Sequence, residues 1–292
     1  MLSSSNLVSD SYPAPSSTAI ALDSERAAIV RRNNVRVIGE GTQTLLFCNG
    51  FGCSQGIWRH LSTPLAKHHR VVLFDYVGTG EADPSAYDEH EYTSLDRYAQ
   101  DVVTICRVLG LREVVLIGHS VGGVIAMLAA IQAPSYFARC VLLAASPCYL
   151  NKPGYYGGLT LEDVNQMLAL LEVDQNSWAN LFAGLLVTPE HSTTLGQELT
   201  GYFCSLDSAI AKRFARVVFL ADNRADVSQL TLPTLVLQDT DDTVAPPEVG
   251  AFLEAHLPHA TLLTLPTAGH CPHLSAPLET MAAIEAFLAK PA

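Results

Sequence analysis

The sequence predicts an α/β protein built around a mostly parallel, doubly wound β-sheet. Short runs rich in Val and Leu recur along the chain, and each is followed by a turn and then by a helical pattern. The runs lack the apolar–polar alternation of a sheet with one solvated face, so we expect helices on both faces. This rhythm stops once, over residues 151–221, where no convincing strand occurs. Together these observations indicate one sheet-based core with a single insertion.

The expected elements follow in order along the chain. An edge strand at 35–38 precedes the first parallel strand, and helical periodicity is clearest at 98–109 and 121–131. The expected parallel strands are residues 44–48, 70–75, 113–117, 139–145, 234–238 and 261–265.

The insertion has the pattern of a helical lid. Polar breaks and breaks containing Gly or Pro divide it into four expected helices, at 161–171, 177–186, 194–203 and 208–221. We therefore expect a lid over residues 151–219 and a core formed by residues 25–150 and 220–292. Residues 1–24 are rich in Ser and Pro and contain no Lys or Arg, so they lack the basic start and apolar run of a secretory signal. We expect them to form a flexible tail.

Composition restricts the function. The 292 residues include 17 Lys and Arg against 29 Asp and Glu, which gives a formal charge of −12. This charge argues against nucleic acid or a membrane as a partner, because anionic surfaces attract proteins with a surplus of Lys and Arg. The hydrophobic content of 49% is enough for a packed core, and no apolar stretch is long enough to span a membrane. Seven Cys without framework spacing fit a reducing, cytoplasmic compartment, and we expect a monomer.

The strongest motif is Gly118-His119-Ser120-Val121-Gly122. It lies between an apolar strand and a helix start rich in small residues, which is the context of a nucleophilic serine on a sharp strand-to-helix turn. Bulky side chains two residues from the serine would collide with the neighbouring backbone, so the motif needs both glycines. A chance match to five letters is the alternative, and the strand–turn–helix context argues against it. The turn would expose the serine Oγ at the carboxyl edge of the sheet, where α/β proteins bind ligands.

A serine nucleophile needs a general base and a carboxylate that orients it, and in this type of site both follow the serine in the chain. Three carboxylates come after the strand at 234–238, namely Asp239, Asp241 and Asp242. Two imidazoles come after the strand at 261–265, namely His270 and His273. Asp is also common in solvated turns, and His can be a core or helix-start residue. The residues alone therefore predict that one of these Asp residues is the orienting carboxylate and one of these His residues is the general base.

A second Gly-containing turn, Asn49-Gly50-Phe51-Gly52, follows the early strand at 44–48. Such a turn can direct a main-chain N–H at the substrate of the serine, and the second donor would be the N–H of Val121. Each preorganised donor stabilises a tetrahedral intermediate by roughly 3 kcal/mol. An ordinary Gly turn is the alternative.

With these motifs assembled, the chain resembles serine hydrolases of the α/β-hydrolase fold. More narrowly, it resembles the group that contains the bacterial stress-response regulator RsbQ and the plant karrikin and strigolactone receptors. The similarity runs over residues 33–289. Its most specific strings are GFGCSQGIW from Gly50, ASPCY from Ala145 and GHCPHL from Gly269.

The resemblance implies roles for individual residues. Ser120 would be the nucleophile, Asp242 the acid and His270 the base, with Phe51 and Val121 supplying the oxyanion N–H groups. The insertion would be a four-helix lid over an enclosed apolar chamber. The residues that would line this chamber are Phe51, His119, Tyr149, Leu159, Trp178, Phe182, Val187 and Phe219. Asn49 stands where the family usually has His, and we expect this change to affect the rigidity of the turn and one supporting hydrogen bond.

The implied function is hydrolysis of a small hydrophobic ester or lactone through an acyl-enzyme, without a metal or an organic cofactor. The alternative is a signalling protein that binds a small ligand and, through the lid, a protein partner such as a PAS-domain phosphatase. Dehalogenases and epoxide hydrolases of this fold place Asp at the nucleophile, so Ser120 argues against them, whereas carbon–carbon bond hydrolases and cofactor-free haloperoxidases keep the serine. A metal site at His270 and His273 is disfavoured, because the pair spans Pro272 and lacks the Glu of a helical metalloprotease.

Overall fold

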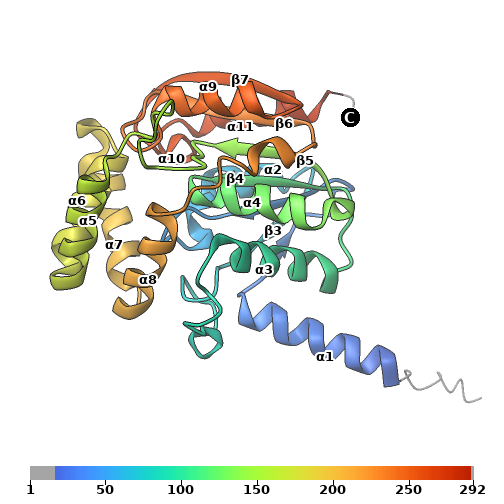
Figure 1. Cartoon of the computed structure of the whole chain (residues 1–292). Coiled ribbons are helices and arrows are strands. Elements are labelled where there is room, and N and C mark those ends of the chain that lie inside the picture. Colours follow the sequence, from blue (N-terminus) through green and yellow to red (C-terminus); the bar gives the residue numbers. More distant parts are fainter. Residues whose placement is uncertain (1–16, 291–292) are drawn as a thin grey trace, which may run out of the picture.

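The structure, a computed structural model, describes residues 17–290. Within these residues a seven-stranded sheet has the order β1-β3-β2-β4-β5-β6-β7, and only the edge strand β1 is antiparallel to its neighbour. Figure 1 labels β3 to β7 of this sheet. The strands are β1 (Arg36–Ile38), β2 (Thr44–Cys48), β3 (Arg70–Leu73), β4 (Val114–His119), β5 (Phe137–Leu143), β6 (Thr234–Asp241) and β7 (Ala260–Ala268). The predicted mostly parallel sheet is confirmed.

The register of the sheet brings distant turns to one edge. Cys48 at the end of β2 is paired with Gly118 near the end of β4, and Asp241 at the end of β6 is paired with Ala268 at the end of β7. Because parallel strands share one direction, the segments that leave these four strands emerge side by side. The inner strands β2 and β4 are completely buried, which explains why their sequences show no polar alternation.

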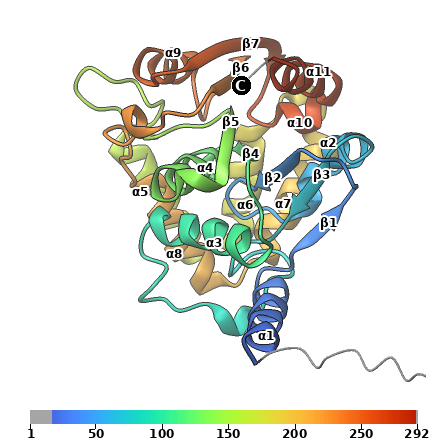
Figure 2. The same ribbon diagram turned by 90° about the vertical axis from the view of Figure 1, so that its right-hand side faces the viewer.

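Helices cover both faces of the sheet, as Figure 2 shows. One face carries α3 (Leu95–Val108), α4 (Val121–Gln132) and α9 (Pro247–His256). The other carries α2 (Arg59–Leu65), α10 (Pro272–Ser275) and α11 (Pro277–Leu288). Short 3-10 helices lie at Gln55–Trp58, Pro84–Ala86, Pro134–Tyr136, Pro189–His191 and Val227–Gln229, and a π-helical turn lies at Ser192–Gly196.

Four lid helices, which come between β5 and β6 in the sequence, form a separate layer beyond the carboxyl edge of the sheet (Figure 1). They are α5 (Leu161–Val173), α6 (Gln175–Leu186), α7 (Gln197–Ser205) and α8 (Ser208–Phe219). Thr160 and Asp163 form a capping box at the start of α5, and the carboxylates of Asp174 and Asp207 accept main-chain N–H groups at the starts of α6 and α8. Each cap satisfies N–H groups that a helix start otherwise leaves unpaired, so these residues determine where the lid helices begin.

The first helix corrects the expected N-terminal tail. Helix α1 (Ser17–Arg32) includes residues 17–24, which were expected to be flexible, and the rest of that segment lies outside the described residues. The helix packs on α3, where Arg107 pairs with Glu25 at 2.6 Å and Arg32 pairs with the buried Asp101 at 2.9 Å. These partners are distant in sequence, so no local pattern reveals them.

Smaller differences have local causes. Helix α6 begins at Gln175 rather than 177 because Asp174 is its cap, and α7 begins at Gln197 rather than 194 because the π-helical turn precedes it. Strand β6 continues to Asp241, three residues past the predicted end, with a register shift against β7 between Asp239 and Asp241. In the described part of the chain, no helix has both the length and the apolar character needed to cross a membrane.

Candidate active site

Ser120 lies on a strained turn between β4 and α4. Its φ of 56° and ψ of −128° are unusual for a residue with a side chain. A Cβ at Gly118 would stand 2.4 Å from the carbonyl oxygen of Gly122, and a Cβ at Gly122 would stand 2.3 Å from those of Cys48 and Asn49. Only glycine fits at either position, as the motif predicts.

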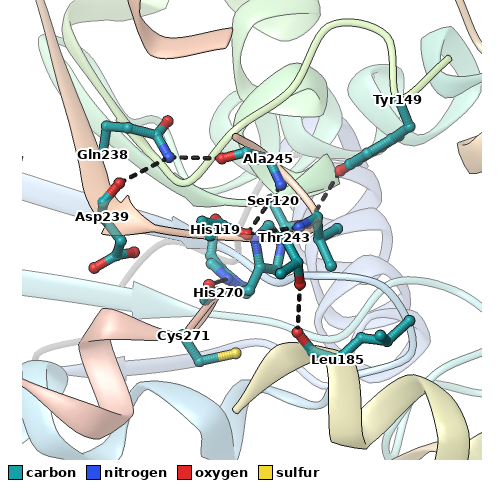
Figure 3. A network of polar contacts seen from close by, with 12 residues as sticks. His119, Ser120, Tyr149, Leu185, Gln238, Asp239, Thr243, Ala245, His270 and Cys271 are labelled. Atoms are coloured by element: carbon teal, nitrogen blue, oxygen red, sulfur yellow. Dashed lines mark hydrogen bonds and ion pairs between the residues drawn. The ribbon is translucent and has the colours of Figure 1, made fainter. Parts of the chain in front are cut away.

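The turns after β4, β6 and β7 bring Ser120, Asp242 and His270 together. The His270 Nε2 lies 2.7 Å from the Ser120 Oγ, and its Nδ1 lies 2.7 Å from the Asp242 Oδ2. All three side chains are buried, and Figure 3 shows the serine and the imidazole at the centre of a polar network. The other Asp242 oxygen accepts the N–H groups of Val244 and Ala245, at 2.8 and 2.9 Å, which fixes the carboxylate. This arrangement can remove a proton from the serine hydroxyl.

The competing carboxylates and the second imidazole lie elsewhere. Asp241 is exposed, whereas Asp239 is buried and accepts a short hydrogen bond from the Thr267 hydroxyl. Burial raises the pKa of Asp239 to about 7. The His273 ring packs at a tilt against Trp58 with centroids 4.7 Å apart, and burial lowers the pKa of His273 to about 3. Both nitrogens of His270 are engaged by Ser120 and Asp242, so the two imidazoles do not converge on a common point as metal ligands would.

His119, which was expected to line the chamber, also supports the main chain of His270. Its Nε2–H donates to the main-chain carbonyl of His270 at 2.7 Å, which fixes the tautomer, because a carbonyl can only accept. Its Nδ1 faces Gly50, where a Cβ would come within 2.6 Å. Burial holds the pKa of His119 well below its ordinary value, so the ring stays neutral.

The Asn49–Gly52 turn lies against the nucleophile turn, because β2 and β4 are neighbours and Gly122 touches the carbonyl of Asn49. As the first residue of α4, Val121 has an N–H without an acceptor inside the helix. The buried Asn49 side chain donates to the Phe74 carbonyl at 2.9 Å and accepts the Trp58 indole N–H at 2.8 Å. Two buried hydrogen bonds therefore hold the turn that Asn49 opens, at the position where the change from His was expected to affect the rigidity of the turn and one supporting hydrogen bond.

The space beside Ser120 is much smaller than the expected chamber. Lid aromatics crowd around Phe51, whose ring centroid lies 5.7 Å from that of Trp178, 6.1 Å from that of Phe182 and 5.8 Å from that of Phe219. The remaining cavity has a volume of about 10 Å³, which is room for about one water molecule. It is lined by Gly50, Phe51, Cys53, His119, Ser120, Phe182, Leu186, Leu199, His270 and Cys271.

Three predicted lining residues thus border the cavity, namely Phe51, His119 and Phe182. Trp178 and Phe219 pack behind them on Phe182, while Leu159 and Val187 are half-buried and are not among the lining residues. Sequence reasoning missed Cys53, Leu186, Leu199 and Cys271 as lining residues. Cys53 and Cys271 lie inside motifs that the resemblance already singled out, whereas the two leucines carry no distinguishing pattern.

Tyr149, which was expected to line the chamber, is not among the residues that border this cavity, but it contacts Ser120 directly. Its hydroxyl lies 3.0 Å from the Ser120 Oγ, and both side chains are buried (Figure 3). Burial raises the pKa of Tyr149, so the phenol stays protonated at neutral pH.

The lid is tied to both of the loops that carry His270 and Asp242. The Leu186 carbonyl at the end of α6 accepts the N–H of His270 at 2.8 Å. The preceding carbonyl, from Leu185, accepts the hydroxyl of Thr243 at 3.1 Å, next to Asp242 (Figure 3). Movement of α6 away from the core would therefore break hydrogen bonds of the residues that hold the triad geometry.

The sheet order, the serine turn and the lid insertion define the class of protein. The model of the alpha/beta hydrolase fold family matches residues 43–277. The chain therefore belongs to the alpha/beta hydrolase fold family, and the fold predicted from the resemblance is confirmed.

Individual relatives show which members of the family the chain is similar to. The chain is 35% identical to a probable esterase of Oryza sativa over 84% of this chain and 91% of the relative. It is 32% identical to a strigolactone esterase of Arabidopsis thaliana, over 86% of this chain and 94% of the relative. The structure of a hydrolase from Oleispira antarctica superposes with a TM-score of 0.88 at 35% identity, covering 91% of this chain and 98% of that one. The resemblance to the strigolactone and karrikin receptor group is thus confirmed.

Proposed function

We propose that the protein is a serine hydrolase that cleaves small hydrophobic esters or lactones through an acyl-enzyme on Ser120. One observation carries the proposal: the hydroxyl of Ser120, the imidazole of His270 and the carboxylate of Asp242 form a chain with two contacts of 2.7 Å. Nucleophile, base and orienting group meet in the geometry that serine acyl transfer needs.

The chemistry follows from these contacts. His270 takes the Ser120 proton as the Oγ attacks the substrate carbonyl, and Asp242 stabilises the imidazolium through Nδ1–H. The N–H groups of Phe51 and Val121 stabilise the oxyanion. His270 then protonates the leaving oxygen, and a water activated by the same imidazole hydrolyses the acyl-enzyme.

The lining supports an apolar substrate. Two phenylalanines, two leucines and two cysteines make up most of the cavity lining, and its volume of about 10 Å³ excludes any organic ester while the lid stays in place. Binding therefore requires α6 and the aromatic side chains around Phe51 to move. The names of the relatives, an esterase and a strigolactone esterase, agree with an ester or lactone.

A reagent that labels nucleophilic serines tests the proposal. We expect a phenyl phosphonate to form one adduct, on Ser120, and Ser120→Ala to lose both the adduct and hydrolysis of p-nitrophenyl acetate while it keeps its fold. Ser146→Ala is the matched control, because this serine is also buried but its hydroxyl donates to the Cys148 carbonyl. Turnover by Ser120→Ala at the wild-type rate would remove Ser120 from the mechanism.

A second candidate, a ligand-responsive signalling protein with slow turnover, is favoured by one observation. The carbonyls of Leu185 and Leu186 tie lid helix α6 to the Asp242 and His270 loops, so an occupied site and the lid position are coupled. The partner would be a protein that binds the lid, of the PAS-domain phosphatase type. We expect hydrogen exchange in α6 to change when Ser120 is phosphonylated. Unchanged hydrogen exchange in α6, together with rapid substrate turnover, would favour an enzyme without a signalling role.

The proposal includes a cytoplasmic monomer with a core of residues 25–150 and 220–292 and a lid of residues 151–219. The seven cysteines are free, and all except Cys204 are buried, which agrees with a reducing compartment. The proposed chemistry uses no metal and no cofactor.

A further inference from the structure

The nucleophile has a second hydroxyl beside it. The Ser120 Oγ lies 2.7 Å from the His270 Nε2 and 3.0 Å from the Tyr149 hydroxyl. A serine hydroxyl has one proton to donate and lone pairs with which to accept. The direction of each bond is therefore decided by its neighbours.

The positions of the protons make Tyr149 the donor in its hydrogen bond with Ser120. The Asp242 carboxylate can only accept, so His270 Nδ1 carries a proton and, in the neutral ring, Nε2 is bare. The Ser120 proton consequently goes to His270 Nε2, and the Tyr149 O–H donates to the Ser120 Oγ. Burial raises the pKa of Tyr149, which keeps this donor protonated.

The ring of Tyr149 is held in place by its surroundings. Its main-chain carbonyl accepts the N–H of Leu159 at 3.0 Å, and its ring packs on Phe219 with centroids 5.5 Å apart. Among the residues that the structure describes, the phenol has no hydrogen-bond partner except Ser120. A buried, preorganised donor is thus directed at the atom where bonds form and break.

We propose that Tyr149 is a catalytic hydrogen-bond donor to the leaving-group oxygen, and that the site is built for esters or lactones whose leaving group is a poor, alkoxide-like one. This inference rests on the proposed hydrolase function. When the Ser120 Oγ bonds to the carbonyl carbon, its lone pair becomes a poorer acceptor. The Tyr149 O–H then turns to the leaving oxygen, which is attached to the same carbon, while Phe51 and Val121 serve the oxyanion.

The step balances without a further reagent. The Oγ–C bond forms and the bond from carbon to the leaving oxygen breaks. The serine proton travels through His270 to that oxygen, and Tyr149 shares its proton but keeps it.

The test compares leaving groups in Tyr149→Phe. A hydrogen bond to a group that develops charge corresponds to a loss of about 10- to 100-fold. We expect kcat/KM for ethyl acetate and δ-valerolactone to fall by that factor, whereas kcat/KM for p-nitrophenyl acetate stays within about threefold because its phenolate leaves without help. The acidic limb of the pH profile should not move.

Tyr155→Phe is the matched control. Tyr155 is a buried tyrosine of the same loop, and its hydroxyl donates to the Cys148 carbonyl at 2.8 Å instead of to Ser120. We expect no dependence on the leaving group in this variant. An equal loss for all substrates in Tyr149→Phe would show a purely structural role and overturn the inference, as would no loss at all.

The two proposals fail differently. A wild-type protein that neither takes the phosphonate label nor hydrolyses p-nitrophenyl acetate contradicts the hydrolase function itself. A wild type that turns over p-nitrophenyl acetate but not the alkyl ester or the lactone contradicts only the inference about Tyr149 and its substrate class.

Discussion

Asn49 opens the turn that carries Phe51, and replacing it should affect both stability and rate. Its amide donates to the Phe74 carbonyl at 2.9 Å and accepts the Trp58 indole N–H at 2.8 Å, and all of these groups are buried. Asn49→Leu keeps a similar side-chain volume but leaves the Phe74 carbonyl and the Trp58 N–H without partners.

The expected magnitude follows from these two orphaned groups. Each buried polar group left unpaired costs about 1–3 kcal/mol. We therefore expect Asn49→Leu to lower the free energy of unfolding by about 3 kcal/mol, or the melting temperature by about 6–10 °C. The loosened Phe51 N–H should lower kcat about 10-fold, less than the 100-fold or more that loss of an oxyanion donor costs.

Urea unfolding and p-nitrophenyl acetate turnover measure both effects, and a double-mutant cycle identifies their cause. Trp58→Phe removes the indole donor, so in the Asn49→Leu background it also removes one of the orphaned groups. We expect the double variant to be about 1–2 kcal/mol more stable than the sum of the single effects predicts. Strict additivity, or a change below about 0.5 kcal/mol in Asn49→Leu, would refute the reasoning.

Two further predictions concern the carboxylates near the base. Asp242→Asn should lower kcat about 10³- to 10⁴-fold, because the tautomer of His270 is no longer fixed. Asp241 is exposed, so Asp241→Asn should have the same kcat as the wild type. Equal losses in the two variants would leave the acid unassigned. Asp239, with a pKa raised by burial from 3.8 to about 7, holds a proton in the folded state that the unfolded chain releases, so stability is lost as the pH rises from 4 to 7. Asp239→Asn should remove this loss. Measured from urea midpoints, the free energy of unfolding of Asp239→Asn minus that of the wild type should rise by roughly 4 kcal/mol between pH 4 and pH 8. A difference independent of pH would show that Asp239 is ionised when folded.

The core could be predicted because its signal is local. A strand covered on both faces, such as Thr44–Cys48, is apolar at every position, and the serine turn needs glycine at residues that a Cβ would fill. Helix α1 was missed for the opposite reason. It is held by pairs such as Glu25 with Arg107, which are far apart in sequence.

The choice among the carboxylates depended on a feature that sequence does not reveal. A register shift between β6 and β7 separates Asp239 from Asp241, and it leaves Asp239 buried, Asp241 exposed and Asp242 at the imidazole. Without the resemblance, the three were equivalent. The contact between Tyr149 and Ser120 likewise depends on the path of the loop after β5, and the cavity volume depends on how closely the lid packs on Phe51.

Burial also decides which of three neighbouring imidazoles can act as the base. The His119 ring lies 5.0 Å from that of His270 and 4.4 Å from that of His273, between centroids. His119 and His273 have no carboxylate partner among the described residues, and desolvation lowers the pKa of both. Only His270 has Asp242 at 2.7 Å to stabilise a positive charge. His119 can therefore pack against His270 and hold its main chain, and His273 can pack behind His119, without adding a charge that would oppose protonation of His270 during attack by Ser120.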